Sequence, residues 1–173
     1  MGKIILIGYR GTGKTTVAEI LGGRWSMPVV DSDKEIEREA KITIAEIFAR
    51  HGEVGFRDIE ESVISRLLDS GEPFILASGG GAILREKTRD KFRVSGKVIW
   101  LQADPETVLK RIQNDAKSRT TRPNLTSLPP LDEIVELIEK RKNLYEQTAH
   151  IKIKTDNITP TQIAEIIISK LKT

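Results

Sequence analysis

The sequence predicts one α/β domain over residues 1–173, in which helices cover both faces of a five-stranded parallel sheet, giving three layers. Two observations support this fold. Short runs rich in β-branched residues alternate with helical patterns, which is typical of βαβ units. The chain has 173 residues, 38% hydrophobic and 31% charged, which suits a single domain with its own core. The predicted strands are Lys3 to Ile7, Pro28 to Val30, Phe74 to Ala77, Lys97 to Leu101 and Ile151 to Lys154.

Helix starts are marked by capping residues at three places. Two are capping boxes, and the third is an acidic residue followed by proline at the first helical position. Apolar periodicity predicts further helices from about Glu53 to Leu68 and from Leu131 to Tyr145. The segment 114–130 has three prolines and no clear period, so we predict a mobile lid over a ligand. The three capping signals are Thr43 with Glu46, Asp104 with Pro105, and Thr159 with Gln162.

Composition and charge restrict the possible partners. The chain has no cysteine, which excludes disulfides and thiolate chemistry and fits a reducing compartment. It begins in an apolar strand without a signal-peptide pattern, and no apolar run could span a bilayer. The net charge is +3, with basic residues scattered rather than gathered in a stripe. We therefore expect a cytoplasmic monomer that binds neither nucleic acid nor a membrane.

The clearest motif is Gly8-Tyr9-Arg10-Gly11-Thr12-Gly13-Lys14-Thr15, which matches GxxxxGK[ST] and lies between a strand and a helix. Glycines let successive backbone N–H groups face phosphate oxygens, and the helix N-terminus adds partial positive charge. Lys14 is expected to reach the β and γ phosphates, and Thr15 to offer its hydroxyl to Mg²⁺. The alternative is a glycine-rich turn that only links the two elements. The motif predicts an ATP site.

Two carboxylates, Asp31 and Asp33, follow the second predicted strand. Ligands bind at the carboxyl edge of open α/β sheets, so this pair suits an acceptor site beside the phosphate loop. One carboxylate could hold Mg²⁺ through water, while the other accepts or orients the proton of a substrate hydroxyl. A helix N-cap is the alternative interpretation, because Asp and Ser are favoured there.

Two arginines fall inside apolar helical arcs. Arg57 shares its arc with Glu60. In a helical projection at about 100° per residue, Arg141 falls between Ile134 and Leu137. A desolvated guanidinium needs an anionic partner, and its planar fork suits a carboxylate. A structural ion pair, or a guanidinium that reaches back to solvent, would also explain each residue. Because two such arginines come from separate helices, we favour a shared pocket for an anionic substrate.

A run of three glycines and one lid arginine complete the candidate site. Gly79, Gly80 and Gly81 follow the third predicted strand, where missing side chains allow a ligand to approach the backbone. A flexible turn is the alternative for this run. Arg122 lies on the predicted lid, from which it could stabilise charge on the γ phosphate during transfer.

In order and spacing, these segments together resemble the shikimate kinase family over nearly the whole chain. The resemblance implies a P-loop fold like that of nucleoside monophosphate kinases. It also implies transfer of the γ-phosphoryl group of ATP to the 3-hydroxyl of shikimate, giving shikimate 3-phosphate and ADP. The matching motifs are Gly8 to Thr15, Asp31-x-Asp33, Phe56-Arg57-x-x-Glu60, Gly79 to Gly81, Arg122-Pro123, and Arg141 in Lys140-Arg141-x-x-Leu144-Tyr145.

The resemblance also implies residue roles. Arg57 and Arg141 would hold the carboxylate of shikimate, Asp33 its hydroxyls, and the glycine run around Gly80 would line the same pocket. Thr15, with Asp31 acting through water, would bind Mg²⁺. Lys14, Asp33 and Arg122 would act in catalysis. The ATP phosphates would be bound by Gly11, Thr12, Gly13, Lys14, Thr15 and Thr16, with Arg122 closing from the lid.

Other functions remain open from the sequence. Within this fold the main alternative is a gluconate-type kinase, which would also use arginines to bind a carboxylate. A nucleoside monophosphate kinase fits less well because no base-binding segment is evident. From another class, the chain could be a nucleotide-gated binding module without transferase activity. A nucleic-acid-dependent ATPase is disfavoured, since there is no aromatic stacking platform or basic stripe.

Overall fold

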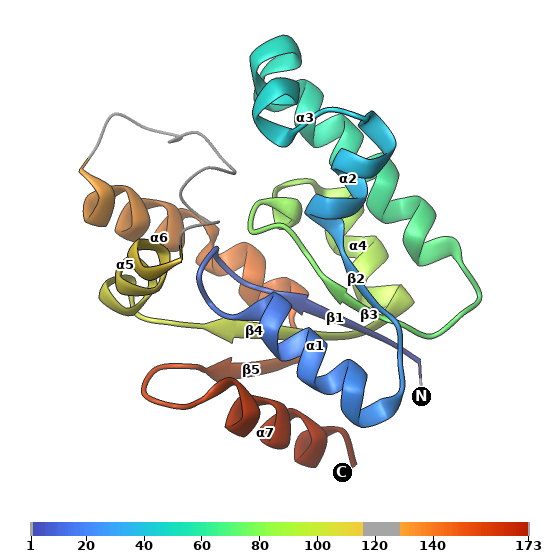
Figure 1. The fold of residues 1–173 in the computed structure, drawn as a ribbon, viewed down its shortest axis with the longest axis vertical. Coiled ribbons are helices and arrows are strands. Elements are labelled where there is room, and N and C mark those ends of the chain that lie inside the picture. The colour runs from blue at the N-terminus through green and yellow to red at the C-terminus, as the bar shows by residue number, and fades with distance from the viewer. Residues whose placement is uncertain (1, 116–128, 173) are drawn as a thin grey trace.

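The computed structural model describes residues 2–115 and 129–172 and contains a five-stranded sheet in the order β2-β3-β1-β4-β5, with every neighbouring pair parallel. The predicted α/β fold with a parallel sheet is confirmed (Figure 1). Three strands differ from the predicted ones, by one residue at both ends of β2 and β4 and at the start of β3. The strands are β1 Lys3–Ile7, β2 Val29–Asp31, β3 Ile75–Ala77, β4 Gly96–Gln102 and β5 Ile151–Lys154.

Helices connect the strands, and two of them carried no clear signal in the sequence. Helix α2 buries one apolar residue, Ile36, and helix α4 buries one, Phe92. One apolar position makes no detectable period, so neither helix was predicted. The helices are α1 Lys14–Trp25, α2 Ser32–Ala40, α3 Ile44–Asp69, α4 Glu86–Ser95, α5 Pro105–Asn114, α6 Pro130–Thr148 and α7 Pro160–Lys172, with a 3₁₀ turn at Ala82–Leu84.

The central strand β1 is apolar at every buried position because helices cover both of its faces. Ile4 and Leu6 pack in the core beneath α1 and α7, whereas Ile5 and Ile7 pack in the core beneath α3, α4 and α6. Figure 1 shows the helices in these two groups. Buried parallel strands therefore read as continuous hydrophobic runs rather than as alternating ones.

The long helix α3 is divided by Gly52, whose φ of 67° lies in the left-handed region. Both sides of this break pack with Ile36 of α2 in a third core, to which Ile44 and Ile47 contribute before the break and Phe56 and Val63 after it. After it, the helix continues onto the sheet. The predicted helix from about Glu53 to Leu68 is this second part.

Capping chemistry sets several helix ends. Both arms of the Thr43–Glu46 box are formed, because the Thr43 hydroxyl accepts from the Glu46 N–H while the Glu46 carboxylate accepts from the Thr43 N–H. Thr159 and Gln162 form the same reciprocal pair. Asp104 occupies the N-cap of α5, as predicted, but its side chain makes no capping hydrogen bond.

The strand order changes direction at β1, since β2 and β3 lie on one side of it and β4 and β5 on the other. In open parallel sheets, such a switch point creates a crevice beyond the carboxyl ends of the strands. The loop after β1, the start of α2 after β2 and the glycine run after β3 all lie at this edge. None of the helices in the described part of the chain is long and apolar enough to cross a membrane.

Candidate active site

The loop between β1 and α1 has the backbone of an anion-binding cradle. Gly8, Gly11 and Gly13 have φ values of 145°, 77° and 91°, which side chains rarely tolerate. A Cβ on Gly8 would lie 2.4 Å from the Leu101 carbonyl oxygen. Gly13 is the N-cap of α1 and has no side chain to accept the first N–H groups of the helix. Those donors point out of the helix end, where an anion is favoured.

Lys14 lies inside this loop and is only 9% exposed. Its ammonium donates hydrogen bonds to the carbonyls of Gly8 and Tyr9, each 2.8 Å away. The hydroxyl of Thr12 also donates to the Tyr9 carbonyl. The loop therefore presents backbone N–H groups outward while two side chains fix its inner carbonyls.

Thr15 and Asp31 come together at the next position. The Thr15 hydroxyl donates to the Oδ2 of Asp31 at 3.0 Å. The other oxygen of Asp31 accepts from the N–H groups of Asp33 and Lys34, so Asp31 is also the N-cap of α2. The N-cap interpretation of the acidic pair is thus confirmed for Asp31, while its predicted part in a Mg²⁺ site stays a prediction. A threonine that gives its proton to a carboxylate keeps its lone pairs for a cation, and hard oxygens suit Mg²⁺.

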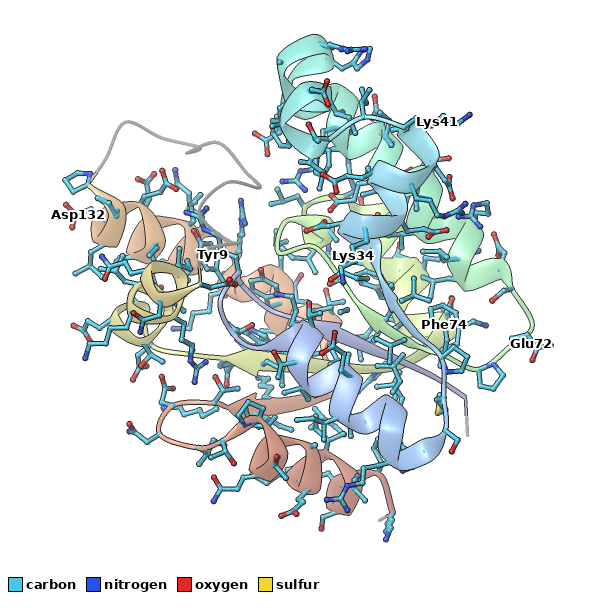
Figure 2. The ribbon with its side chains drawn as sticks, viewed as in Figure 1. Tyr9, Lys34, Lys41, Glu72, Phe74 and Asp132 are labelled. Atoms are coloured by element: carbon cyan, nitrogen blue, oxygen red, sulfur yellow. The ribbon has the colours of Figure 1, made fainter. Side chains whose placement is uncertain are left out.

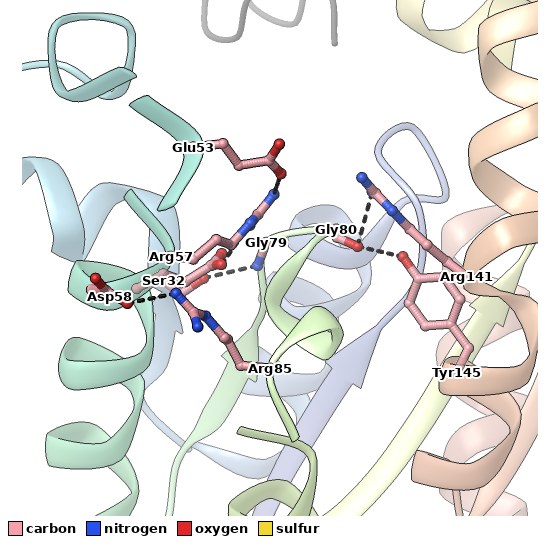
Figure 3. A network of polar contacts seen from close by, with 10 residues as sticks. Ser32, Glu53, Arg57, Asp58, Gly79, Gly80, Arg85, Arg141 and Tyr145 are labelled. Carbon is pink, nitrogen blue, oxygen red and sulfur yellow. Dashed lines mark hydrogen bonds and ion pairs between the residues drawn. The ribbon is translucent and has the colours of Figure 1, made fainter. Parts of the chain in front are cut away.

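The first turn of α2 faces the glycine run. Ser32 is fully buried, and its hydroxyl accepts a hydrogen bond from the Gly79 N–H at 2.9 Å (Figure 3). Asp33, the next residue, is partly exposed. The sequence indicated no role for Ser32, which lies between two aspartates. Its role could not be inferred because the contact joins positions 47 residues apart.

Arg57 is buried on α3 and pairs with two carboxylates. One guanidinium nitrogen contacts Glu60 at 2.5 Å, and another contacts Glu53 at 3.3 Å. The predicted pairing with Glu60 is confirmed, and Glu53 adds a second partner. The guanidinium also lies against Gly81, where an added Cβ would come within 2.2 Å of a nitrogen. Gly81 is therefore a glycine because the arginine fills the space of its side chain.

Arg141 reaches the same glycine run from α6 on the opposite side (Figure 3). It is 6% exposed, and a guanidinium nitrogen lies 3.4 Å from the Gly80 carbonyl oxygen. The hydroxyl of Tyr145 donates to the same oxygen at 2.5 Å. The two arginines predicted to share a pocket thus both contact the glycine run, Arg57 at Gly81 and Arg141 at Gly80.

Sequence reasoning missed a polar cluster around Tyr9, whose ring lies among the phosphate loop, α5 and α6 (Figure 2). The guanidinium groups of Arg10 and Arg141 each stand 5.9 Å from the ring centre. Burial raises the pKa of the Tyr9 hydroxyl, although both arginines act in the opposite direction. Arg10 also pairs with the buried Glu133 at 3.4 Å. Only the short loop motif placed Arg10 near a ligand, and nothing in the sequence indicated Glu133.

Arg111 was also missed. It lies on α5, and its guanidinium donates to the carbonyl of Gly11 and to both the hydroxyl and the carbonyl of Thr155. It thereby joins the phosphate loop to the segment after β5. These contacts span 44 and 100 residues, so no local pattern could reveal them.

Two other features delimit the site. A cavity of about 270 Å³ opens behind the phosphate loop, between Tyr9, Trp100 and Tyr145, and neither Arg57 nor Arg141 lines it. It is therefore separate from the two arginines at the glycine run. The predicted lid 114–130 falls almost wholly in 116–128, and Arg122 with it, outside the described residues.

The described geometry combines a glycine-rich loop of anion-binding form, a hydroxyl–carboxylate pair and two buried arginines against the glycine run, all along one sheet edge. The family model named shikimate kinase matches residues 10–172. This chain belongs to the shikimate kinase family. It is 40% identical over 170 residues to the shikimate kinase of Symbiobacterium thermophilum, a match that covers 98% of this chain and 96% of the relative.

Solved structures agree with the shikimate kinase fold. The shikimate kinase from Acinetobacter baumannii in complex with shikimate has a TM-score of 0.91 and 34% identity, covering 99% of this chain and 93% of that one. A gluconokinase from Sinorhizobium meliloti covers 99% of this chain and 91% of its own, with a TM-score of 0.65 and 17% identity. At that identity the likeness extends to the fold alone. The predicted nucleoside-monophosphate-kinase-like P-loop fold is consistent with these structures.

Proposed function

We propose that this chain transfers the γ-phosphoryl group of ATP to the 3-hydroxyl of shikimate, giving shikimate 3-phosphate and ADP for aromatic amino acid biosynthesis. The observation that carries the proposal is the place of Gly80 between two half-sites, which are the phosphate loop on one side and the arginines of the acid pocket on the other. A Cβ on Gly80 would lie 3.2 Å from the Arg10 N–H nitrogen of the phosphate loop. Its carbonyl contacts Arg141 of the acid pocket. A phosphate donor and a carboxylate-bearing acceptor would thus be adjacent.

On the nucleotide side, backbone N–H groups from Gly11 to Thr16 bind the phosphates of ATP. Lys14 supplies a fixed positive charge, which stabilises the charge that develops on the β and γ phosphates. The chain has little covalent work to do in phosphoryl transfer, so positioning and electrostatics dominate. Lys14 is held for this work by two carbonyls of its own loop.

Thr15 and Asp31 fit a magnesium ion. Mg²⁺ usually takes one or two protein oxygens and completes its shell with phosphates and water. The Thr15 hydroxyl would supply a direct ligand, and Asp31, which accepts a hydrogen bond from that hydroxyl, would act on the ion through water. When bound, the ion would neutralise charge on the phosphates during transfer.

On the acceptor side, Arg57 and Arg141 grip the carboxylate of shikimate, and Asp33 faces its hydroxyls. Asp33 accepts or orients the proton of the attacking hydroxyl as the bond to the γ phosphorus forms. The backbone from Gly79 to Gly81 lets the ring approach because no side chain intervenes. Arg122 is proposed to act from the lid on the γ phosphate.

A gluconate-type kinase and an inactive nucleotide-gated module are the competing functions. The first shares only the fold with this chain. The second does not explain why Lys14 is held inside the phosphate loop while Thr15 is hydrogen-bonded to Asp31. We further propose that the protein acts as a monomer in the cytoplasm, which sizing chromatography and cell fractionation would test.

The deciding experiment is a coupled ADP-release assay with Mg²⁺-ATP and a panel of acceptors. Shikimate is expected to stimulate ADP release strongly, whereas gluconate and nucleoside monophosphates leave the background rate unchanged. Stimulation by gluconate alone would move the assignment to the competing kinase. ATP binding without stimulation by any acceptor would indicate the inactive module.

A further inference from the structure

Three arginines contact the glycine run, Arg57 and Arg141 through their guanidinium groups and Arg10 through its backbone nitrogen. They differ in their carboxylate partners. Arg57 pairs with Glu60 and Glu53, and Arg10 pairs with Glu133. Within residues 2–115 and 129–172, Arg141 contacts the Gly80 carbonyl and the Tyr9 ring but no carboxylate. The uncompensated charge at the pocket therefore belongs to Arg141. One such charge matches one carboxylate.

Arg10 stands at the boundary between the two half-sites. Its backbone nitrogen packs beside Gly80, and its guanidinium flanks the Tyr9 ring as Arg141 does. Its side chain is 28% exposed, so it is within reach of solvent and ligand. The transferred phosphoryl group passes from the phosphate loop to the acceptor, so it must lie near this boundary once it has left ADP.

Glu133 is buried in the first turn of α6, with its side chain only 4% exposed. Removing a carboxylate from water is costly, and an ion pair offsets that cost. Salt screens a partly buried pair only weakly, so the charge of Glu133 also acts on the neighbouring pocket. Glu133 is thus placed to cancel the charge of Arg10.

We infer that Glu133 is a specificity-determining residue, which neutralises Arg10 so that the pocket favours the monoanionic substrate over the product that carries an added phosphate. This inference rests on the proposed function. Without Glu133, the charge of Arg10 acts on the new phosphate and the product is held. With Glu133 present, the product gains no additional cation and is released.

The test measures equilibrium binding of shikimate and of shikimate 3-phosphate, without nucleotide, by titration calorimetry. The quantity compared is the ratio of the two dissociation constants. Glu133→Gln is expected to favour shikimate 3-phosphate by roughly fivefold or more relative to wild type, a typical size for coupling between groups. Arg10→Met is expected to shift the ratio the other way, because it removes a cation while Glu133 keeps its negative charge. The double variant should return close to the wild-type ratio.

Glu139→Gln provides the matched control, since Glu139 is an exposed residue of the same helix, and its ratio should stay unchanged. An unchanged ratio in Glu133→Gln overturns the inference, as does an equal shift in Glu139→Gln. If Glu133→Gln does not fold, the direction of the Arg10→Met shift decides. Wild-type protein that binds neither ligand would instead refute the proposed function.

Discussion

The hydroxyl of Tyr145 donates to the carbonyl of Gly80 at 2.5 Å, and Arg141, one helical turn earlier, lies 3.4 Å from the same oxygen. The glycine run, Tyr145 and Arg141 are therefore joined through one shared acceptor. Trp100 supports this arrangement, because its ring stacks on that of Tyr145. The pocket depends on a side chain that need not touch the substrate.

Tyr145→Phe removes this donor while keeping the ring stack. Loss of a buried hydrogen bond is expected to lower the free energy of unfolding by about 1–2 kcal/mol. The KM for shikimate should rise while the KM for ATP changes little, because the bond fixes the acceptor side. Denaturant unfolding and steady-state kinetics check both. Equal rises in the two KM values would contradict the prediction.

Lys14→Met should abolish phosphoryl transfer, with a fall in kcat on the order of 100-fold or more, since a preorganised charge at the phosphates is lost. Single-turnover kinetics with Mg²⁺-ATP and shikimate provide the measurement. Lys87→Met is the control, because Lys87 is exposed on α4. Normal turnover by Lys14→Met would rule out the nucleotide site as drawn.

Asp33→Asn should remove transfer but not ATP binding, because only the acceptor side is altered. If Asp33 acts on the substrate proton, kcat is expected to fall by about 10²- to 10⁴-fold. The dissociation constant of a non-hydrolysable ATP analogue, measured by calorimetry, should match that of wild type. A variant that turned over shikimate at the normal rate would show that Asp33 does not have this role.

Gly81→Ala should damage the acid pocket. An added Cβ would overlap the Arg57 guanidinium at 2.2 to 2.5 Å, so the arginine must move and its fork loses alignment. We expect the KM for shikimate to rise by about tenfold, which corresponds to about 1.4 kcal/mol. Gly71→Ala is the matched control, since nothing lies within 4 Å of a Cβ there.

His150 predicts how stability depends on pH. Its Nδ1 accepts a hydrogen bond from the Val98 N–H. Burial lowers the pKa of His150, and the charges of Arg93 and Lys97 lower it further. The folded state thus prefers the neutral ring, so this contribution to stability is present above the unfolded pKa of about 6.5 and is lost as pH falls through the lower folded pKa.

Thermal unfolding of wild type and His150→Asn between pH 8 and pH 5 tests this dependence. The Asn amide keeps an acceptor near Nδ1 but does not titrate, so the variant should lose less stability on acidification. His51→Asn is the control, because His51 is exposed. Parallel curves for wild type and His150→Asn would exclude His150 as the titrating group.

The sequence was sufficient for the strands and the phosphate loop because their signals are local. Strand β1 is a continuous apolar run, and the glycine spacing of the loop reports backbone geometry directly. Helices α2 and α4 escaped prediction because each packs with one large apolar residue. Short charged helices of this kind are specified by tertiary contacts more than by periodicity.

The candidate site could be predicted as a set of residues but not as a set of contacts. Arg57 and Arg141 were suspected because charge on an apolar arc is unusual. Ser32 and Glu133 were missed, since each acts through a partner far along the chain, Gly79 for the serine and Arg10 for the glutamate. Pairing between distant positions leaves no period in one sequence.

The break in α3 at Gly52 has a consequence for how this protein tolerates change. Arg57 follows the break, but its neighbour Phe56 belongs to the core that the turn from Ile44 to His51 forms with α2. Phe56 stacks on Phe48 from before the break, and the Arg57 guanidinium lies 5.0 Å from the centre of the Phe56 ring. The outer turn is therefore coupled to this arginine through two stacked rings. We expect substitution of Phe48 to shift Arg57, whereas changes at exposed positions of the same turn leave it in place.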